Sequence, residues 1–180
     1  MARSFAERMI GAAMLDVSVY EEVEADEGAT GQAAGVVALV AVASAIGAYH
    51  NGGRGAIGAM IAALVSWALW AGVTYLVGTR FMGGTATWGE LLRTLGFAQA
   101  PGVLNVLGIV PVLGGLVTFV VWVWTLVTAI VAIRQALDFD TGKAVITAVV
   151  SFIFVFAVTL FVGALFSSVA ILGGLMASHW

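Results

Sequence analysis

The stretch "LGFAQAPGVLNVLGIVP", residues 95–111, is apolar enough for a membrane interior, yet it contains both prolines of the chain. It also holds two carboxamide side chains, Gln99 and Asn105, between apolar runs. A proline inside a helix frees a backbone carbonyl from its hydrogen bond, and lipid cannot supply a replacement donor. We therefore expect a kinked membrane segment whose freed carbonyl is satisfied by neighbouring helices or by the two carboxamides. The alternative is that Gln99 and Asn105 border a small polar pocket beside the kink.

The composition around this stretch indicates that the chain is dissolved in lipid. Hydrophobic residues make up 62% of the 180 residues and charged residues only 9%, whereas about a quarter of the residues in a soluble globule are charged. We expect an all-α membrane protein, a bundle of about five transmembrane helices with an amino-terminal amphipathic interfacial helix. The expected transmembrane domain is 31–180, with spans near 32–49, 56–78, 91–110, 116–137 and 144–166.

The last apolar run continues beyond its expected span as an apolar carboxyl-terminal extension. From Lys143 to Met176 it is too long for one straight crossing, because a helix rises about 1.5 Å per residue. It either tilts and continues outside the bilayer, or it bends near Gly163 or at Gly173 and Gly174. The sequence leaves both possibilities open.

The first 30 residues form a separate segment, which we expect on the cytosolic side. Apolar side chains recur there at steps of three or four residues, at Phe5, Met9, Ala13, Val17 and Tyr20. This spacing predicts an amphipathic helix lying on the membrane surface. Acidic residues follow directly before the first span. A solvated face is the simpler interpretation of these acids, and docking of a partner is the alternative.

The distribution of basic residues predicts the orientation. With five crossings, six of the seven basic residues fall on one side and only Arg54 on the other. Positive residues concentrate on the cytoplasmic side of membrane proteins, so we expect the amino terminus inside and the carboxyl terminus outside. All ten carboxylates fall on the same inner side. A charged partner would therefore bind from the cytosol.

Three stretches together resemble the bacterial branch of the Yip membrane-protein family, named for Ypt/Rab-interacting proteins. They are "YEEVEADEGATGQA", "ELLRTLGFAQAPGVLNVLGIVPVLGGL" and "VWTLVTAIVAIRQALDFDTGKAVITAVV", and the resemblance runs from about residue 15 to 160. It implies a cytosolic amino-terminal segment, five crossings, an acidic-aromatic motif before the first crossing and a glycine-aromatic motif followed by proline in the third. The corresponding family-motif or partner-binding residues are Tyr20, Glu21, Glu22, Asp26, Gly96, Phe97 and Pro101.

Catalytic and metal-binding patterns are missing from the sequence. The chain has no cysteine, no glycine-rich phosphate loop and no HExxH motif, and it has two histidines, His50 and His179. We expect no enzyme, no resident metal and no nucleic-acid partner. A cofactor is likewise not expected, and the one alternative is ligation of a metal or a chlorin pigment by His50.

Two classes of function are compatible with these observations. The preferred one is a non-catalytic polytopic protein of the prokaryotic cytoplasmic membrane that organises the bilayer by packing with lipids, with other membrane proteins or with itself. The alternative is an accessory subunit of a larger membrane complex, such as a bioenergetic assembly. A transporter of a neutral or lipid-like substrate is a smaller alternative, since no charged residue is expected near the middle of the membrane.

Overall fold

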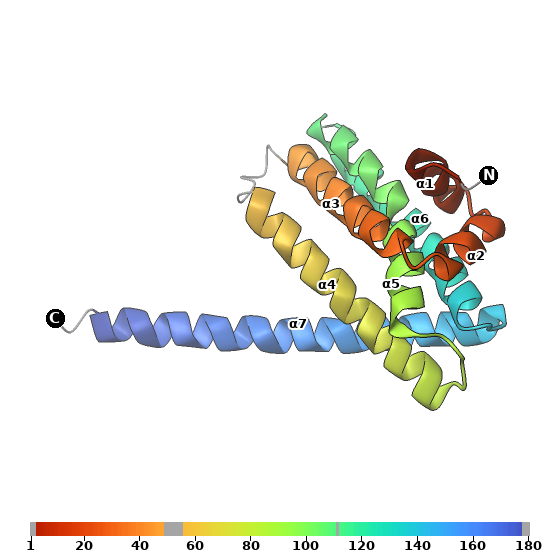
Figure 1. The fold of residues 1–180 in the computed structure, drawn as a ribbon. Coiled ribbons are helices and arrows are strands. Elements are labelled where there is room, and N and C mark those ends of the chain that lie inside the picture. The colour runs from red at the N-terminus through yellow and green to blue at the C-terminus, as the bar shows by residue number, and fades with distance from the viewer. Residues whose placement is uncertain (1–2, 49–55, 111, 178–180) are drawn as a thin grey trace.

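The structure, a computed structural model, describes residues 3–48, 56–110 and 112–177, and all regular structure in these residues is helical (Figure 1). This finding confirms the predicted all-α class. In chain order the elements are α1 (Phe5–Ala13), α2 (Val17–Ala25), α3 (Ala29–Gly47), α4 (Ala56–Leu76), the π-helix η2 (Val77–Phe81), α5 (Trp88–Phe97), the 3-10 helix η3 (Ala100–Ile109), α6 (Gly114–Ala136) and α7 (Thr141–Ala177).

Four of the described helices are long and apolar enough to cross a membrane. They comprise Ala29–Gly47, Ile57–Phe81, Gly114–Ala136 and Thr141–Phe161. Large apolar side chains lie exposed along all four, for example Leu39 on α3, Val65 on α4, Phe119 on α6 and Phe154 on α7. Lipid tails cover such surfaces in a bilayer, so the exposed apolar faces agree with a membrane-embedded bundle. The third predicted crossing, residues 91–110, is not among these four helices.

Residues 91–110 belong to two helical pieces instead of one kinked α-helix. The α-helical piece, α5, ends at Phe97, and η3 begins at Ala100 with Pro101 in its first turn. Proline fits there because the first amides of a helix have no intrahelical acceptor. The ten residues of η3 form an unusually long 3-10 helix, since runs beyond three or four residues are uncommon. The expected kink is thus a change of helix type.

A side chain of α6 satisfies a carbonyl at this junction. The Thr128 hydroxyl donates to the Ala98 carbonyl at 2.6 Å. The sequence analysis expected either neighbouring helices or the carboxamides of Gln99 and Asn105 to satisfy the freed carbonyl, and within the described residues neither carboxamide makes such a hydrogen bond. A neighbouring helix supplies the donor, as lipid-embedded backbone requires.

The junction also packs closely against α3. A Cβ atom placed on Gly96 would lie 2.6 Å from the Cβ of Ala33, and one placed on Gly102 would lie 2.5 Å from Cγ1 of Val40. Only glycine permits such an approach, and small residues are what allow helices to associate closely in lipid. α3 therefore lies along both α5 and η3, as Figure 1 shows.

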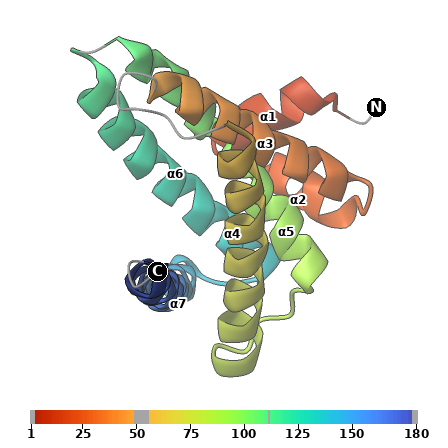
Figure 2. The ribbon, with the colours of Figure 1, turned by 90° about the vertical axis from the view of Figure 1, so that its left-hand side faces the viewer.

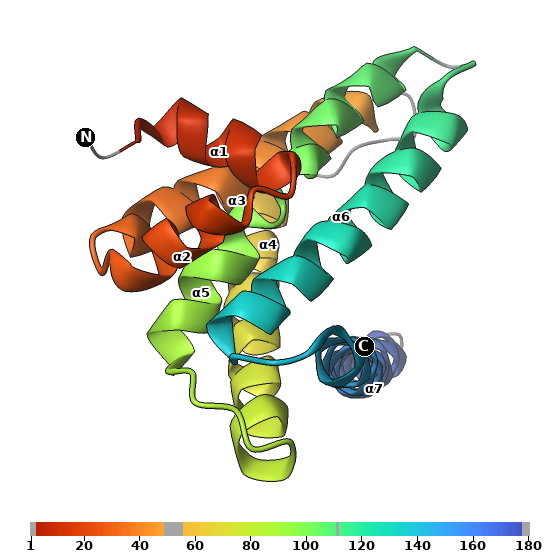
Figure 3. The same ribbon diagram turned by 90° about the vertical axis from the view of Figure 1, so that its right-hand side faces the viewer.

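α7 differs from the rest of the bundle in length and direction. It is one helix of 37 residues, about 55 Å long, so the apolar run after residue 143 neither ends nor changes helix type at its glycines. Figures 2 and 3 show α7 end-on where the other long helices are seen along their length. It packs on α4, α6 and η2, and its carboxyl-terminal part extends beyond the other helices (Figure 1).

Candidate functional site: the amino-terminal clasp

The first candidate site is the unit formed by α1 and α2 together with the side chains of α3, α5 and α6 that hold them, here called the clasp. Its two helices begin at defined caps. Ser4 and Glu7 form a reciprocal capping box at α1, and the Asp16 side chain accepts from the Ser18 amide at the start of α2. Leu15 between them has a φ of 63°. The predicted single helix through Tyr20 is therefore wrong, because the chain turns sharply at Leu15 and Asp16.

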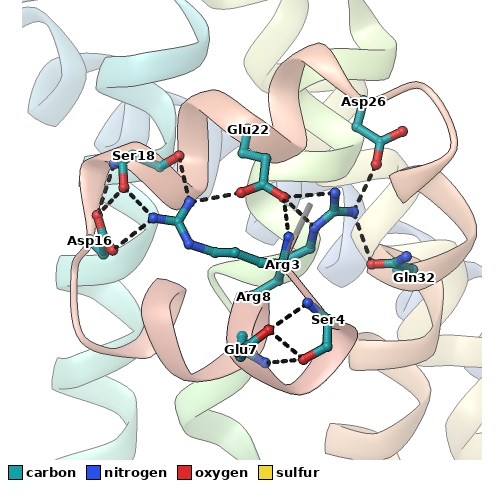
Figure 4. A network of polar contacts seen from close by, with 9 residues as sticks. All are labelled: Arg3, Ser4, Glu7, Arg8, Asp16, Ser18, Glu22, Asp26 and Gln32. Atoms are coloured by element: carbon teal, nitrogen blue, oxygen red, sulfur yellow. Dashed lines mark hydrogen bonds and ion pairs between the residues drawn. The ribbon is translucent and has the colours of Figure 1, made fainter. Parts of the chain in front are cut away.

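Arg8 is the centre of a polar network that joins α1 to α2 and α3 (Figure 4). Only 3% of Arg8 is exposed. Its guanidinium pairs with Glu22 at 2.9 Å and with Asp26 at 2.8 Å, and it donates to Gln32 of α3 at 3.1 Å. The hydrogen bond from Arg8 lowers the pKa of the Asp26 carboxyl from its ordinary value. The pairing keeps Arg8 and both carboxylates charged at neutral pH.

Arg3 adds a second, more exposed cation to the same network. It pairs with Glu22 at 2.7 Å, donates to the Ser18 hydroxyl at 2.8 Å and lies 3.6 Å from Asp16 (Figure 4). Ion pairs at such exposed positions stabilise a fold by less than about 1 kcal/mol. Arg8 therefore contributes most to the network, and Arg3 pairs with its carboxylates on the solvent-exposed side.

Arg93 fastens the carboxyl end of α2 to α5. It is 6% exposed, and its Nε donates to the Val23 carbonyl at 2.9 Å and to the Glu24 carbonyl at 3.1 Å. Its Nη2 donates to the Glu24 carbonyl as well. The last carbonyls of a helix have no intrahelical donor and form the negative end of the helix dipole, so a buried cation is well placed there. The arginine thus replaces water as the partner of these carbonyls.

Aromatic side chains form the apolar floor of the clasp. Tyr20 is fully buried and its hydroxyl donates to the Ala12 carbonyl at 2.9 Å, and its burial raises the pKa of the phenol. Phe97, also fully buried, meets Phe5 edge to face with 6.4 Å between ring centroids. The family-motif aromatics of α2 and α5 therefore pack inside the same unit.

A group of carboxylates lies on the outer side of the clasp. Burial, together with the negative charges of Glu90 and Asp138, raises the pKa of Glu24 to about 7. Glu21 is exposed and accepts a hydrogen bond from Gln135 of α6 at 3.4 Å. Carboxylates from α2, α5 and the end of α6 thus converge on one acidic surface.

The structure divides the seven family-motif residues into three groups. Four are buried: Tyr20, Gly96, Phe97 and Pro101. Two accept from Arg8: Glu22 and Asp26. Glu21 remains on the surface. Tyr20, Phe97, Glu22 and Asp26 therefore hold the clasp together, Gly96 and Pro101 are buried at the junction of α5 and η3, and Glu21 is exposed on the acidic surface.

Gln99 and Asn105 do not share a pocket. Gln99 borders a cavity of about 350 Å³ between α4, α6 and α7. Asn105 borders a different cavity of about 930 Å³, and its Nδ2 donates to the Ser44 hydroxyl at 3.1 Å. Trp122 of α6 borders both cavities. The prediction of one polar pocket shared by Gln99 and Asn105 is therefore wrong, because the two side chains line different cavities.

Three structural residues that the sequence analysis missed are donors to backbone carbonyls. Besides Arg93 and Thr128, they include Trp124, whose indole donates to the Ala13 carbonyl at the end of α1 at 2.8 Å. Arg93 left a signal in the sequence, since a basic residue within an apolar segment needs a partner. Threonine and tryptophan left none, because both are ordinary residues of membrane helices.

The described residues contain no group of side chains suited to a metal ion. Within residues 3–48, 56–110 and 112–177, no three His, Cys, Asp or Glu side chains are grouped so that they could hold a metal ion. His50 lies outside the described residues, so its predicted ligand role stays a prediction. Arg54, on which the orientation argument relies, lies outside them as well.

Comparison with known proteins agrees with the resemblance carried by the motifs. The model of the Yip1 domain matches residues 18–164, from α2 through the first two thirds of α7. The chain therefore belongs to the Yip1 domain family. Neither the curated proteins nor the solved structures contain a match. The family match shows nothing of the source, so the bacterial origin stays a prediction.

Proposed function

We propose that this Yip1-domain protein is a non-catalytic organiser of the membrane, which binds a partner through the acidic surface of its clasp. The observation that carries the proposal is the contrast between the two kinds of motif residue. The aromatic residues Tyr20 and Phe97 are buried in the clasp, and Gly96 and Pro101 are buried at the junction beside it. Glu21 lies instead on the surface, and Glu24, Glu90 and Asp138 lie near it. A rigid scaffold that presents converging carboxylates suits a basic partner protein.

The membrane topology belongs to the same proposal. The chain has five crossings, with α5 and η3 forming the third, in a prokaryotic cytoplasmic membrane. Ten residues of α-helix and ten of 3-10 helix span about 35 Å end to end, since they rise about 1.5 and 2.0 Å per residue. This length is sufficient for a hydrocarbon core of about 30 Å. The amino terminus is then inside and the carboxyl terminus outside.

Single-cysteine labelling tests this topology, because the native chain contains no cysteine. Ser18→Cys in the clasp and Ser178→Cys near the carboxyl terminus are each exposed to a membrane-impermeant maleimide in intact cells. We expect labelling at residue 178 only, and labelling at residue 18 only after the cells are opened. Labelling of both residues in intact cells, or of neither, would contradict five crossings with the amino terminus inside.

The docking role is tested by neutralising the acidic surface. Glu21→Gln combined with Glu90→Gln leaves the arginine network of the clasp unchanged, and Asp140→Asn at the start of α7 serves as the matched control. Cross-linking in native membranes should identify proteins held by the wild type and by the control but lost in the double variant. An unchanged set of cross-linked proteins in the double variant would contradict the proposal.

The subunit role is a second candidate, and α7 favours it. Its apolar side chains are exposed, including Phe152, Ile153 and Phe161, and the helix is longer than the bilayer is thick. A helix of this kind suits packing against another membrane protein. Purification in mild detergent distinguishes the two roles, because a stoichiometric complex with other chains supports the subunit role and a monomer or homo-oligomer opposes it.

A further inference from the structure

A groove between α4, α6 and α7 lies apart from the clasp. Its volume of about 350 Å³ falls within the usual range of small-molecule sites, about 300–1,000 Å³. Four aromatic side chains line it: Trp67, Trp70, Trp122 and Phe152. Trp67 and Trp122 lie near the middle of α4 and of α6, so in a bilayer the groove lies deep in the hydrocarbon.

Two polar groups of the groove have no partner in the described part of the chain. The carboxamide of Gln99 lines the groove and makes no hydrogen bond with the described residues. The indole N–H of Trp70, in the wall of the groove, is buried and has none either. An unsatisfied donor costs about 1–3 kcal/mol in an apolar environment, so such groups call for an acceptor. Trp67 is different, since its indole donates to the Leu92 carbonyl at 3.1 Å.

We infer that this groove binds a neutral membrane molecule with a flat ring that bears carbonyl oxygens and an apolar tail, the chemistry of a membrane quinone. The ring lies among the four aromatic side chains, in the offset or edge-on arrangements that aromatic pairs favour. One carbonyl oxygen accepts from the Gln99 carboxamide. The tail leaves toward the lipid past Trp122, which is 54% exposed.

The acyl chain of a phospholipid fits these observations less well. Its ester oxygens stay in the interfacial region of the bilayer, whereas Gln99 and Trp70 place their donors near the middle of the hydrocarbon. An acyl chain would therefore leave the Gln99 carboxamide without a partner. A charged ligand is disfavoured too, because no ionisable side chain lines the groove and charge is costly at this depth.

The test is quenching of tryptophan fluorescence in the full-length protein in nanodiscs, with a decyl-substituted benzoquinone as the probe. We expect quenching that saturates with increasing quinone. Gln99→Leu should raise the half-saturating quinone concentration about 3- to 10-fold, which corresponds to the loss of one neutral hydrogen bond. Asn105→Leu is the matched control, since it removes the same kind of group from the other cavity, and it should leave the titration unchanged.

Trp122→Leu supplies a second variant, because this exposed residue can be replaced without disturbing the core, and it should also weaken binding. Quenching that rises linearly with the quinone-to-lipid ratio and is equal in all variants would mean partition into the bilayer only, and would overturn the inference. A phospholipid with brominated chains serves as a competing probe. If it quenches the fluorescence in a saturable way and added benzoquinone does not reverse this quenching, the groove binds an acyl chain, and this result would overturn the inference as well. Neither result bears on the docking role of the clasp.

Discussion

The clasp and α7 are held in place by different means. In the clasp, the carboxyl end of each helix meets a specific donor, Trp124 for α1 and Arg93 for α2, and Thr128 has the same role at the adjoining end of α5. On α7 the described side chains are mostly apolar and exposed, and the buried hydroxyls of Thr147 and Ser151 have no described hydrogen-bond partner. Substitutions should therefore lower the free energy of unfolding strongly in the clasp and only slightly on α7.

This difference follows from the surroundings of the two regions. Short helices expose orphan amides and carbonyls at each end, and near or inside a membrane these groups need partners from the protein. A helix of 37 residues has only two ends, and its hydrogen bonds are satisfied internally along its length. The position of α7 thus depends on its environment, whereas that of the clasp is encoded in side-chain contacts.

The largest effect is expected at Gly96. Gly96→Leu forces a side chain into the space of Ala33, where even a Cβ would lie 3.2 Å from the backbone carbonyl oxygen. Overpacking of this kind should lower the free energy of unfolding by about 3 kcal/mol. Gly31→Leu is the control, because no atom lies within 4 Å of a Cβ there. Unfolding by sodium dodecyl sulfate in mixed micelles measures both, and equal losses would contradict the close contact between α3 and α5.

The next effect is expected at Arg8. Arg8→Met should cost about 2 kcal/mol, less than the 3–5 kcal/mol of a fully buried pair, because Glu22 and Asp26 remain partly hydrated. Lys143→Met at the start of α7 removes a cation that lies 5.5 Å from the Phe139 ring and should change little. The same detergent titration compares the two variants. A loss at Lys143 as large as at Arg8 would erase the proposed distinction between the clasp and α7.

A smaller difference in unfolding free energy is expected between two variants that each remove a buried hydroxyl. Thr128→Val leaves the Ala98 carbonyl without its donor and should cost about 1 kcal/mol. Ser151→Ala removes a hydroxyl that has no described partner, so the unfolding free energy should stay within about 0.5 kcal/mol or rise. If Ser151→Ala proved the more costly change, α7 would have to be anchored by polar contacts.

The last effect is a dependence on pH that originates at Glu24. Its pKa is raised from 4.5 to about 7 in the folded chain, so folding favours the protonated acid. Stability from this group is therefore greatest below pH 4.5, falls as the pH rises to about 7 and is constant above. Glu24→Gln should remove this decline, as thermal unfolding between pH 5 and pH 8 can show. An identical pH profile in the variant would mean that the acidic surface does not destabilise the clasp.

The sequence was sufficient to predict the helical class and the family because apolar runs and motif residues are local signals. It also indicated a disturbance at Pro101, although not its form as a 3-10 helix, which depends on close packing of η3 against α3. The break at Leu15 was missed, since the periodicity of apolar residues continues through it. The roles of Arg8 and Arg93 were missed for a different reason: their partners are distant in sequence, and Arg93 contacts carbonyls 69 and 70 residues away.

The central claim is that the family motifs lock α1 and α2 onto the bundle, and amide hydrogen exchange in nanodiscs tests it most directly. We expect slow exchange in residues 17–25, comparable with α3, and a marked acceleration there in Arg8→Met while α7 stays unchanged. Exchange of residues 17–25 within seconds in the wild-type protein would show an undocked segment, and would contradict the claim.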